Sequence, residues 1–329
     1  MNTMRLPRLT YLEPKTRAEL IAFKEAYGEQ CAIMGGGTDL IPRLKRRCIP
    51  TRHLVSIKGI AELSEICRQE GGRPFIGAGV ILRDVIDHPI VSRSYPLLAR
   101  AALSVATNQL RNMGTLGGNL CLDNRCPYDG QSELWWARRA DCFKRGGNTC
   151  YVARGGKRCM SRSAADTIPA LMVLEAEVLV VGPRGERRTP IEDFYTGDGR
   201  KPCRLGGDEL VGGVLLPPAD DGWREGFMKK SPRGSIDFSI ASLAVRLKMH
   251  GGSVEAVRIA LNGVSTRPVR AKGAERHLTG KDLSHETIKA CVPLMVQAAG
   301  PVSLIGVSPA YRRRVIEVMF TDLVQHLVA

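Results

Sequence analysis

Five of the ten cysteines in this 329-residue chain fall within residues 111–160. They are Cys121, Cys126, Cys142, Cys150 and Cys159. The last four are separated by 16, 8 and 9 positions, so none of them forms a C-x-x-C pair. Four thiolates can hold an iron–sulfur cubane, and soft sulfur ligands favour iron–sulfur or zinc over hard cations. Because structural zinc sites usually contain closely spaced cysteine pairs, this spacing favours iron–sulfur but leaves zinc open.

Two glycine-rich loops could bind the phosphates of a dinucleotide. They are residues 35–39 (GGGTD) and residues 114–119 (GTLGGN). Glycines let the backbone turn sharply and approach a pyrophosphate closely, while Thr38, Thr115 and Asn119 can bond phosphate or ribose oxygens. The first loop matches neither the G-x-G-x-x-G fingerprint nor the P-loop. The two loops could hold one dinucleotide from opposite sides, and this pairing is more specific than either loop alone.

Helix caps, apolar runs and turn residues predict the elements that carry these loops. The predicted helices cover residues 16–27, 81–87, 95–110, 168–174, 284–299 and 308–327. The predicted strands cover residues 31–34, 53–57, 75–80, 226–230, 243–249 and 254–261, with a further hairpin at 177–188. The segment PPADDG at 217–222 is typical of a linker, and we place a domain boundary there.

Length and composition predict two or three packed units, because 43% of the residues are apolar. The N-terminal residues lack the apolar run of a secretory signal. No stretch approaches the roughly 20 apolar residues of a membrane span. We therefore expect a cytoplasmic protein without a membrane partner. Structural disulfides are not expected in that compartment, which leaves the cysteines as buried thiols or metal ligands.

The chain is basic, with 48 Lys and Arg against 33 Asp and Glu, a net charge of +15. Such a field attracts acidic partners. Only 5% of the residues are aromatic and no known nucleic-acid module is recognisable, so we expect no nucleic-acid partner. The basic surface could instead simply be solvated. It could also bind an acidic redox protein, or the phosphorylated part of a substrate on a neighbouring subunit. Residues 111–160 alone hold nine basic and four acidic side chains.

The two loops, GGGTDL at 35–40 and RNMGTLGGNL at 111–120, resemble those of a known family. It comprises the FAD-binding subunits of the molybdenum hydroxylases, the xanthine and carbon monoxide dehydrogenase group. The resemblance covers nearly the whole chain and implies an α+β fold. A FAD-binding domain of the vanillyl-alcohol-oxidase type would comprise two subdomains, residues 1–58 and 59–217. A C-terminal domain with a three-stranded sheet and helices would follow over residues 222–329.

The resemblance also implies which residues bind FAD. In the family, an aspartate soon after the second loop holds the adenosine end of FAD in a pattern like S-x-x-D-x-x-P. Residues 163–169 fit this pattern, with Asp166 at the aspartate position, but they come later than expected. A segment has therefore been inserted between Asn119 and Asp166. The expected FAD-binding residues are Met34, Gly35, Gly36, Gly37, Thr38, Asp39, Leu40, Thr107, Gly114, Thr115, Leu116, Gly117, Gly118, Asn119 and Asp166.

The inserted segment, at about residues 121–160, resembles a more specific group. Its cysteine gaps and the sequence NLCLDNRC at 119–126 are similar to the β subunits of 4-hydroxybenzoyl-CoA reductases, which carry an extra [4Fe-4S] cluster. The cluster ligands that this resemblance implies are Cys126, Cys142, Cys150 and Cys159. Cys121 would then be a packed free thiol. Basic residues near the cluster would raise its potential, and exposed ones could dock an acidic donor such as ferredoxin.

The function implied is electron transfer, in which cofactors react and the protein positions them, so no side chain is expected to be catalytic. Electrons from reduced ferredoxin would enter at the [4Fe-4S] cluster and pass to FAD. They would leave through [2Fe-2S] clusters on a small subunit for a molybdenum site on a large subunit, where 4-hydroxybenzoyl-CoA is reductively dehydroxylated. The implied assembly is a heterotrimer that pairs into a dimer of trimers.

Two alternatives remain at this point. The first is a FAD subunit of an oxidative molybdenum hydroxylase, of the xanthine, carbon monoxide or N-heterocycle dehydrogenase type, which delivers electrons to NAD or a quinone. The second is a zinc-stapled basic protein that binds nucleic acid through the inserted segment.

Overall fold

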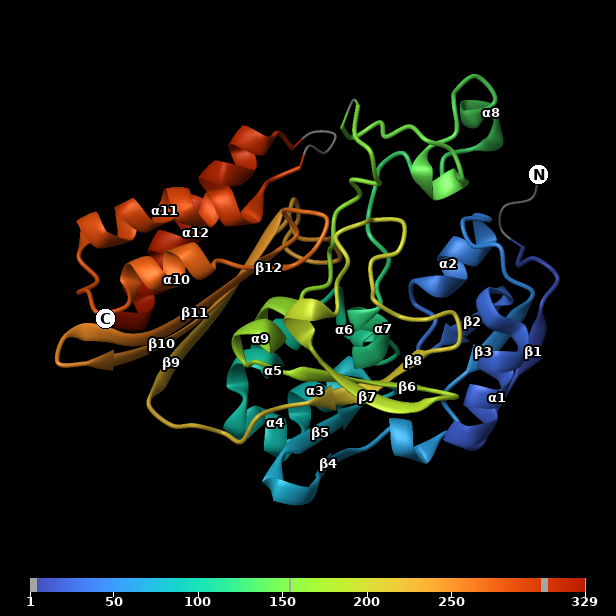
Figure 1. Ribbon diagram of the computed structural model, residues 1–329, viewed down its shortest axis with the longest axis horizontal. Helices are drawn as coiled ribbons and strands as arrows, with labels where there is room; N and C mark the ends of the chain where they lie inside the picture. The colour runs from blue at the N-terminus through green and yellow to red at the C-terminus, as the bar shows by residue number, and fades with distance from the viewer. Residues whose placement is uncertain (1–4, 154, 303–306, 329) are drawn as a thin grey trace.

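The computed structural model describes residues 5–153, 155–302 and 307–328, which form three sheets and the helices packed on them (Figure 1). The first sheet is parallel. Its strands, in spatial order, are β1 (Thr10–Leu12), β3 (His53–Ser56) and β2 (Cys31–Met34). Two helices accompany this sheet, α1 (Arg17–Tyr27) and α2 (Leu40–Lys45). The first glycine loop joins β2 to α2, so its position is fixed by an element on each side.

Helix α1 begins where the capping box predicts. The Thr16 hydroxyl accepts a hydrogen bond from the Glu19 N–H at 3.2 Å, which satisfies one of the free N–H groups of the first turn. Leu20 on this helix is fully buried. It shares a core with Val55 of β3 and Leu179 of the second sheet, so the two sheets are packed into one body.

The second sheet is antiparallel and has five strands. In spatial order they are β4 (Ile66–Arg68), β5 (Pro74–Gly77), β8 (Leu210–Leu215), β6 (Glu177–Gly182) and β7 (Gly185–Pro190). The helices of this unit are α3 (Leu82–Asp87), α4 (Pro89–Ser94), α5 (Pro96–Leu103), α6 (Asn108–Arg111), α7 (Leu116–Leu120) and α9 (Ile168–Val173). Strand β5 is shorter than the strand predicted over residues 75–80, because the chain turns into α3 after Gly77.

The single helix predicted over residues 95–110 is wrong. The segment forms α5 and α6 instead, because Ala106 between them has a positive φ of 46°, which no right-handed helix can include. The Thr107 hydroxyl then caps α6 by accepting a hydrogen bond from the Leu110 N–H at 3.3 Å. This break turns the chain toward the second glycine loop, which directly precedes α7.

The third sheet lies in the C-terminal part of the chain and is antiparallel. Its strands, in spatial order, are β12 (Val269–Arg270), β11 (Ser253–Asn262), β10 (Ala241–His250) and β9 (Trp223–Lys230). The predicted three-stranded sheet therefore gains a fourth, two-residue strand. The helices α10 (Lys272–Leu278), α11 (His285–Ala299) and α12 (Pro309–Val328) cover one face (Figure 1).

The two faces of this third sheet are buried against different partners. Leu243, Val245 and Ile259 belong to the core beneath α10, α11 and α12. The alternating residues Ala244 and Ala260 join the core of the second unit, and α9 contacts both β10 and β11. Because side chains alternate between the faces of a strand, the sheet has packing partners on both faces, and these contacts fix the C-terminal part against the rest.

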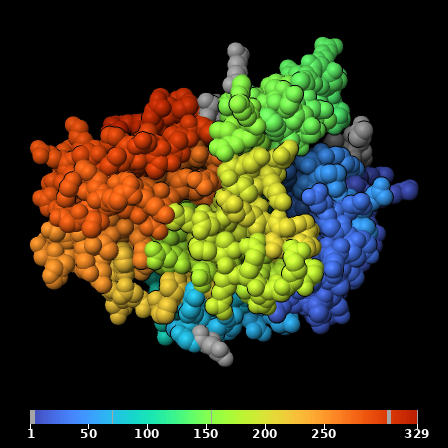
Figure 2. All heavy atoms as spheres, in the orientation of Figure 1, coloured from blue at the N-terminus to red at the C-terminus, as the bar shows by residue number. Residues whose placement is uncertain are grey.

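The described residues of 121–160, which are 121–153 and 155–160, form a protrusion with little regular structure (Figures 1 and 2). It contains the short helix α8 (Glu133–Trp136) and a 3-10 turn at Phe143–Arg145. At its base, Arg125 and Arg162 exchange backbone hydrogen bonds of 2.8 and 3.0 Å, which close the segment into a loop. Among the described residues, no helix combines the length and apolarity that a bilayer span requires.

Candidate cofactor sites

The two glycine loops lie against each other, backbone to backbone. A Cβ atom added to Gly36 would collide with the carbonyl group of Met113, and one added to Gly35 would lie 2.5 Å from the Thr115 hydroxyl oxygen. Gly37 has a φ of +70°, a conformation that L side chains rarely adopt. The loops that the sequence predicts to act as a pair therefore do meet, and the close approach requires glycine.

A cleft opens on each side of this loop contact, with volumes of about 290 and 270 Å³. Gly35, Thr115 and Gly118 line both clefts, so a long ligand could pass from one to the other across the loops. Eleven of the fifteen residues expected to bind FAD line these clefts. They are Gly35, Gly36, Gly37, Thr38, Asp39, Leu40, Gly114, Thr115, Gly117, Gly118 and Asn119.

The other four expected residues, Met34, Thr107, Leu116 and Asp166, do not line either cleft. Leu116 is fully buried in the core, and the Thr107 hydroxyl caps α6. Cys121 also differs from the expectation of a packed thiol, because it is exposed and lines both clefts.

Charged and aromatic groups form one wall of the larger cleft, and of these only Asp39 is among the expected FAD-binding residues. The Asp39 carboxylate pairs with the Arg125 guanidinium, which also lies over the Phe238 ring, 4.2 Å from its centroid. Arg43 and Asp123 line the same cleft. No local spacing could have connected these residues, since they come from three distant segments. They give the cleft hydrogen-bond donors and an aromatic face, both of which suit a flavin nucleotide.

Asp166 lies behind the clefts, at the junction with the C-terminal sheet. Its carboxylate forms an ion pair with Lys229 of β9 at 2.6 Å, and the two side chains are only 5% and 11% exposed. Burial raises the pKa of the Asp166 carboxyl group, and the Lys229 ammonium group opposes this shift. The Oδ1 atom of Asp166 is buried without a hydrogen-bond partner among the described residues.

We expect the variant Asp166→Asn to lower the free energy of unfolding of the flavin-free protein by about 3 kcal/mol, because Lys229 would lose its partner in a buried position. Urea denaturation would measure this. A matched control is Asp208→Asn, which removes the partner of the exposed Arg184 and should change stability by less than about 1 kcal/mol. Unchanged stability together with weaker FAD binding would contradict the structural role and place Asp166 at the cofactor.

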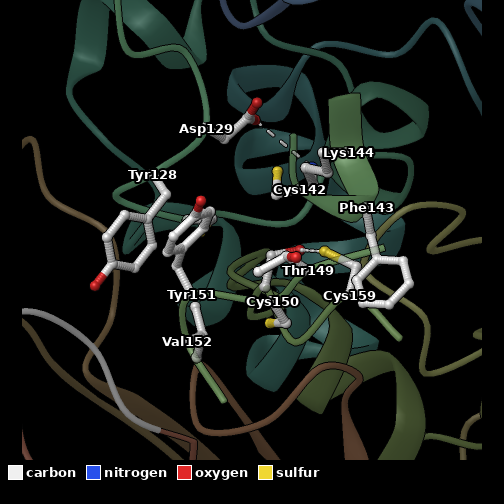
Figure 3. A pocket seen from close by; sticks show the side chains of 12 residues that line it. Tyr128, Asp129, Cys142, Phe143, Lys144, Thr149, Cys150, Tyr151, Val152 and Cys159 are labelled. Carbon is white, nitrogen blue, oxygen red and sulfur yellow. Dashed lines mark hydrogen bonds and ion pairs between the residues drawn. The ribbon is translucent and has the colours of Figure 1, made fainter. Parts of the chain in front are cut away.

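The four cysteines expected as cluster ligands line a single pocket in the protrusion (Figure 3). They are Cys126, Cys142, Cys150 and Cys159. The Tyr128 and Tyr151 side chains lie on one side of this pocket and Phe143 on the other. The pocket shares no lining residue with the two clefts. The sequence therefore selected four side chains that the fold brings together, although they span 34 positions of irregular chain.

Burial raises the pKa of two of these thiols. The pKa of Cys126 is raised to about 11, chiefly by burial and to a smaller extent by the nearby Cys159 and Asp129 side chains, while backbone hydrogen bonds from Tyr128 and Asp129 oppose the shift. Burial also raises the pKa of Cys159, which the Ser161 hydroxyl and Lys144 oppose. A metal binds the thiolate form, so loading must release protons from this pocket.

The pocket does not have the geometry of a site for a single metal ion. Within the described residues, no three histidine, cysteine, aspartate or glutamate side chains are close enough together to hold one ion. The pocket has a volume of only about 20 Å³, room for about one water. A zinc ion would need all its sulfur ligands at about 2.3 Å from one centre. In a four-iron cluster each thiolate binds its own iron atom, so the sulfurs lie further apart.

Two family models cover almost the whole chain. Residues 7–219 match the FAD binding domain in molybdopterin dehydrogenase, and residues 226–327 match the CO dehydrogenase flavoprotein C-terminal domain. The chain belongs to this family of FAD-binding subunits. The pair of glycine loops and the clefts beside them are therefore parts of a flavoprotein.

This FAD-binding subunit is similar to relatives of several kinds. It is 31% identical over 274 residues to the FAD-binding subunit of an aldehyde oxidoreductase from Escherichia coli (strain K12), covering 78% of this chain and 82% of that protein. It is 29% identical over 296 residues to the carbon monoxide dehydrogenase medium chain of Hydrogenophaga pseudoflava, covering 90% and 88%. A solved structure of carbon monoxide dehydrogenase from Hydrogenophaga pseudoflava superposes with a TM-score of 0.81 at 27% identity, covering 98% of each chain.

The comparisons confirm part of what the sequence predicts. The family is confirmed, and so is the combination of a FAD-binding domain with a C-terminal domain of mixed helix and sheet. The iron–sulfur insert and the closer resemblance to 4-hydroxybenzoyl-CoA reductases stay predictions. The oxidative alternative fits the same relatives.

Proposed function

We propose that the chain is the FAD and [4Fe-4S] electron-transfer subunit of a molybdenum-containing oxidoreductase. In this proposal it accepts electrons from reduced ferredoxin and supplies them to partner [2Fe-2S] clusters and a molybdenum site that reductively dehydroxylates 4-hydroxybenzoyl-CoA. The single observation that carries the proposal is that four cysteines line one pocket, in a protrusion beside the flavin clefts.

The clefts suit FAD in shape and in chemistry. Gly35 and Gly36 let the two loops approach closely, because a Cβ atom on either would collide with the second loop, and Gly118 lines both clefts beside this contact. Thr38 and Asn119 supply polar groups at the larger cleft. FAD, when bound, supplies the exchange of one or two electrons. The residues of the chain bind it, orient it and shield it from water.

The cysteine pocket suits an iron–sulfur cluster in the type and number of its donors. Four thiols are present, and Phe143 and Val152 add apolar surface that limits access of water. Because the pocket is small, binding of a cluster must move the cysteine side chains outward. The irregular backbone of the protrusion allows such an adjustment more easily than a helix or strand would.

The partners and the domain division belong to the same proposal. The names of the relatives, medium chain and FAD-binding subunit, support a place in a larger enzyme. We propose a heterotrimer with a molybdenum-cofactor large subunit and a [2Fe-2S] small subunit, which pairs into a dimer of trimers. We also keep the proposed division at residues 1–58, 59–217 and 222–329.

The competing function is the FAD subunit of an oxidative molybdenum hydroxylase that delivers electrons to NAD or a quinone, as the names of the relatives favour. Anaerobic reduction of the purified enzyme separates the two proposals. We expect reduced ferredoxin to bleach the flavin absorbance and NADH to leave it unchanged. Rapid bleaching by NADH with no response to ferredoxin would contradict the reductive function.

A further inference from the structure

Four charged side chains form a network between the flavin cleft and the cysteine pocket. The Lys144 ammonium group lies 2.7 and 2.8 Å from the two carboxylate oxygens of Asp123 and 3.7 Å from Asp129. Arg43 forms an ion pair with Asp123 and lies 3.4 Å from Asp129. Lys144 also donates to the backbone carbonyl of Asn124 at 3.0 Å. Each of the two cations, Arg43 and Lys144, therefore lies close to both carboxylates, those of Asp123 and Asp129.

The network connects elements that are far apart in the sequence. Arg43 comes from α2, directly after the first glycine loop, whereas Asp123, Asp129 and Lys144 come from the protrusion. Arg46, directly after α2, adds a hydrogen bond of 2.9 Å to the carbonyl of Gly130. Helix α2 therefore forms part of the wall of the larger cleft and also contacts the protrusion.

The two ends of the network lie in different sites. Arg43 and Asp123 line the larger flavin cleft. Asp129 and Lys144 line the cysteine pocket (Figure 3). The Arg43 and Lys144 side chains are only 8% and 7% exposed, so solvent screens their ion pairs weakly. Removing one of the four charged side chains leaves the charges of its partners without one of their counter-charges. We therefore expect a change at one member to affect the positions of the others.

We propose that this network couples the two sites, so that FAD in the cleft orders the cysteine pocket and a filled pocket strengthens the binding of FAD. The inference rests on the proposed function of the two sites. Arg43 and Lys144 act in it as positioning residues. The coupling must be reciprocal, since each ligand stabilises the same arrangement of the four charges.

The first test measures FAD affinity by fluorescence titration of the full chain. Lys144 does not line the cleft, so any effect of its substitution on FAD must pass through the network. We expect Lys144→Met to weaken FAD binding at least about fivefold, the lower end of typical coupling factors. Lys144→Arg should restore it. The matched control Arg138→Met removes an exposed cation from the same protrusion and should leave the affinity unchanged.

The second test measures the rates at which N-ethylmaleimide alkylates the individual cysteines, in the full chain freed of metal and flavin. We expect added FAD to slow alkylation of Cys142 and Cys150 at least about fivefold in the wild type and in Lys144→Arg. The protection should disappear in Lys144→Met. Cys121 lines the clefts and reports FAD binding directly, and Cys67 of β4 reports any general change in the fold.

Equal FAD affinity in the wild type and Lys144→Met, or equal protection of the pocket cysteines in both, would overturn the coupling. If FAD slowed alkylation of Cys142 and Cys150 in Lys144→Met as strongly as in the wild type, the coupling would be wrong even if this variant bound FAD more weakly. The thiol measurement needs no iron, so a failure of the proposed cluster would show separately as an absence of iron and sulfide, with the coupling result unaffected.

Discussion

The variant Cys142→Ser is expected to lose more than half of its iron and acid-labile sulfide while it still binds one FAD when FAD is supplied in excess. Serine replaces a soft thiolate by a hydroxyl group that binds iron poorly, and four cysteines are the complete ligand set available in this pocket. The FAD site itself should remain, because the pocket and the clefts have no lining residue in common, and the proposed coupling would lower the affinity for FAD without removing its site. Colorimetric iron and sulfide assays and the flavin absorbance measure both contents on one sample.

Cys67→Ser provides the matched control for this experiment. Cys67 is a half-buried cysteine of β4 in the five-stranded sheet, outside the protrusion, and its substitution should change neither content. An iron content that Cys142→Ser leaves unchanged would remove this cysteine from the ligand set. Failure of the variant to bind FAD even when FAD is in excess would instead indicate that the substitution disturbs the whole fold.

The variant Gly118→Asp is expected to weaken FAD binding about 100-fold. An added Cβ atom meets only the Thr115 hydroxyl oxygen, at 3.1 Å, so the side chain fits without a backbone collision. Gly118 lines both clefts, and a carboxylate there would face the pyrophosphate. Repulsion between two such charges at about 5 Å amounts to roughly 3 kcal/mol at an effective dielectric constant of 20. Titration of the flavin-free protein with FAD measures the loss.

Gly118→Asn separates the charge from the size of the new side chain, because it has nearly the same shape and no charge. It should bind FAD much more tightly than Gly118→Asp, and both variants should unfold at the wild-type temperature when flavin is absent. Equal affinities for FAD in the two variants would contradict the assignment of the phosphates to this loop.

Sequence reasoning succeeds in this chain where the information is local. The Thr16 and Glu19 capping box predicts the first residue of α1, and the run at residues 31–34 predicts β2 and the glycine loop that follows. The glycines of the two loops also indicate a long-range contact. Gly36 has no room for a side chain because it contacts a loop about 80 residues away along the chain. The four cysteines that the resemblance of the inserted segment implies as ligands line one pocket, and their role as cluster ligands stays a prediction.

The features that sequence reasoning missed depend on distant contacts. The alanine- and leucine-rich segment 95–110 has high helix propensity, yet the helix ends at Leu103 and the chain turns at Ala106, which has a positive φ. Strand β12 has two residues, too few to leave a pattern. Arg43 and Asp123 are 80 positions apart, and nothing in the spacing of either residue indicates that they pair.

The measurement that tests the central claim most directly is the content of iron, acid-labile sulfide, zinc and flavin per chain, in protein purified without oxygen. We predict about four irons and four sulfides together with one FAD, because one cubane and one flavin are the cofactors proposed for the pocket and the clefts. One zinc per chain with no sulfide would contradict the cluster and leave the protrusion with a structural role in an ordinary FAD-binding subunit.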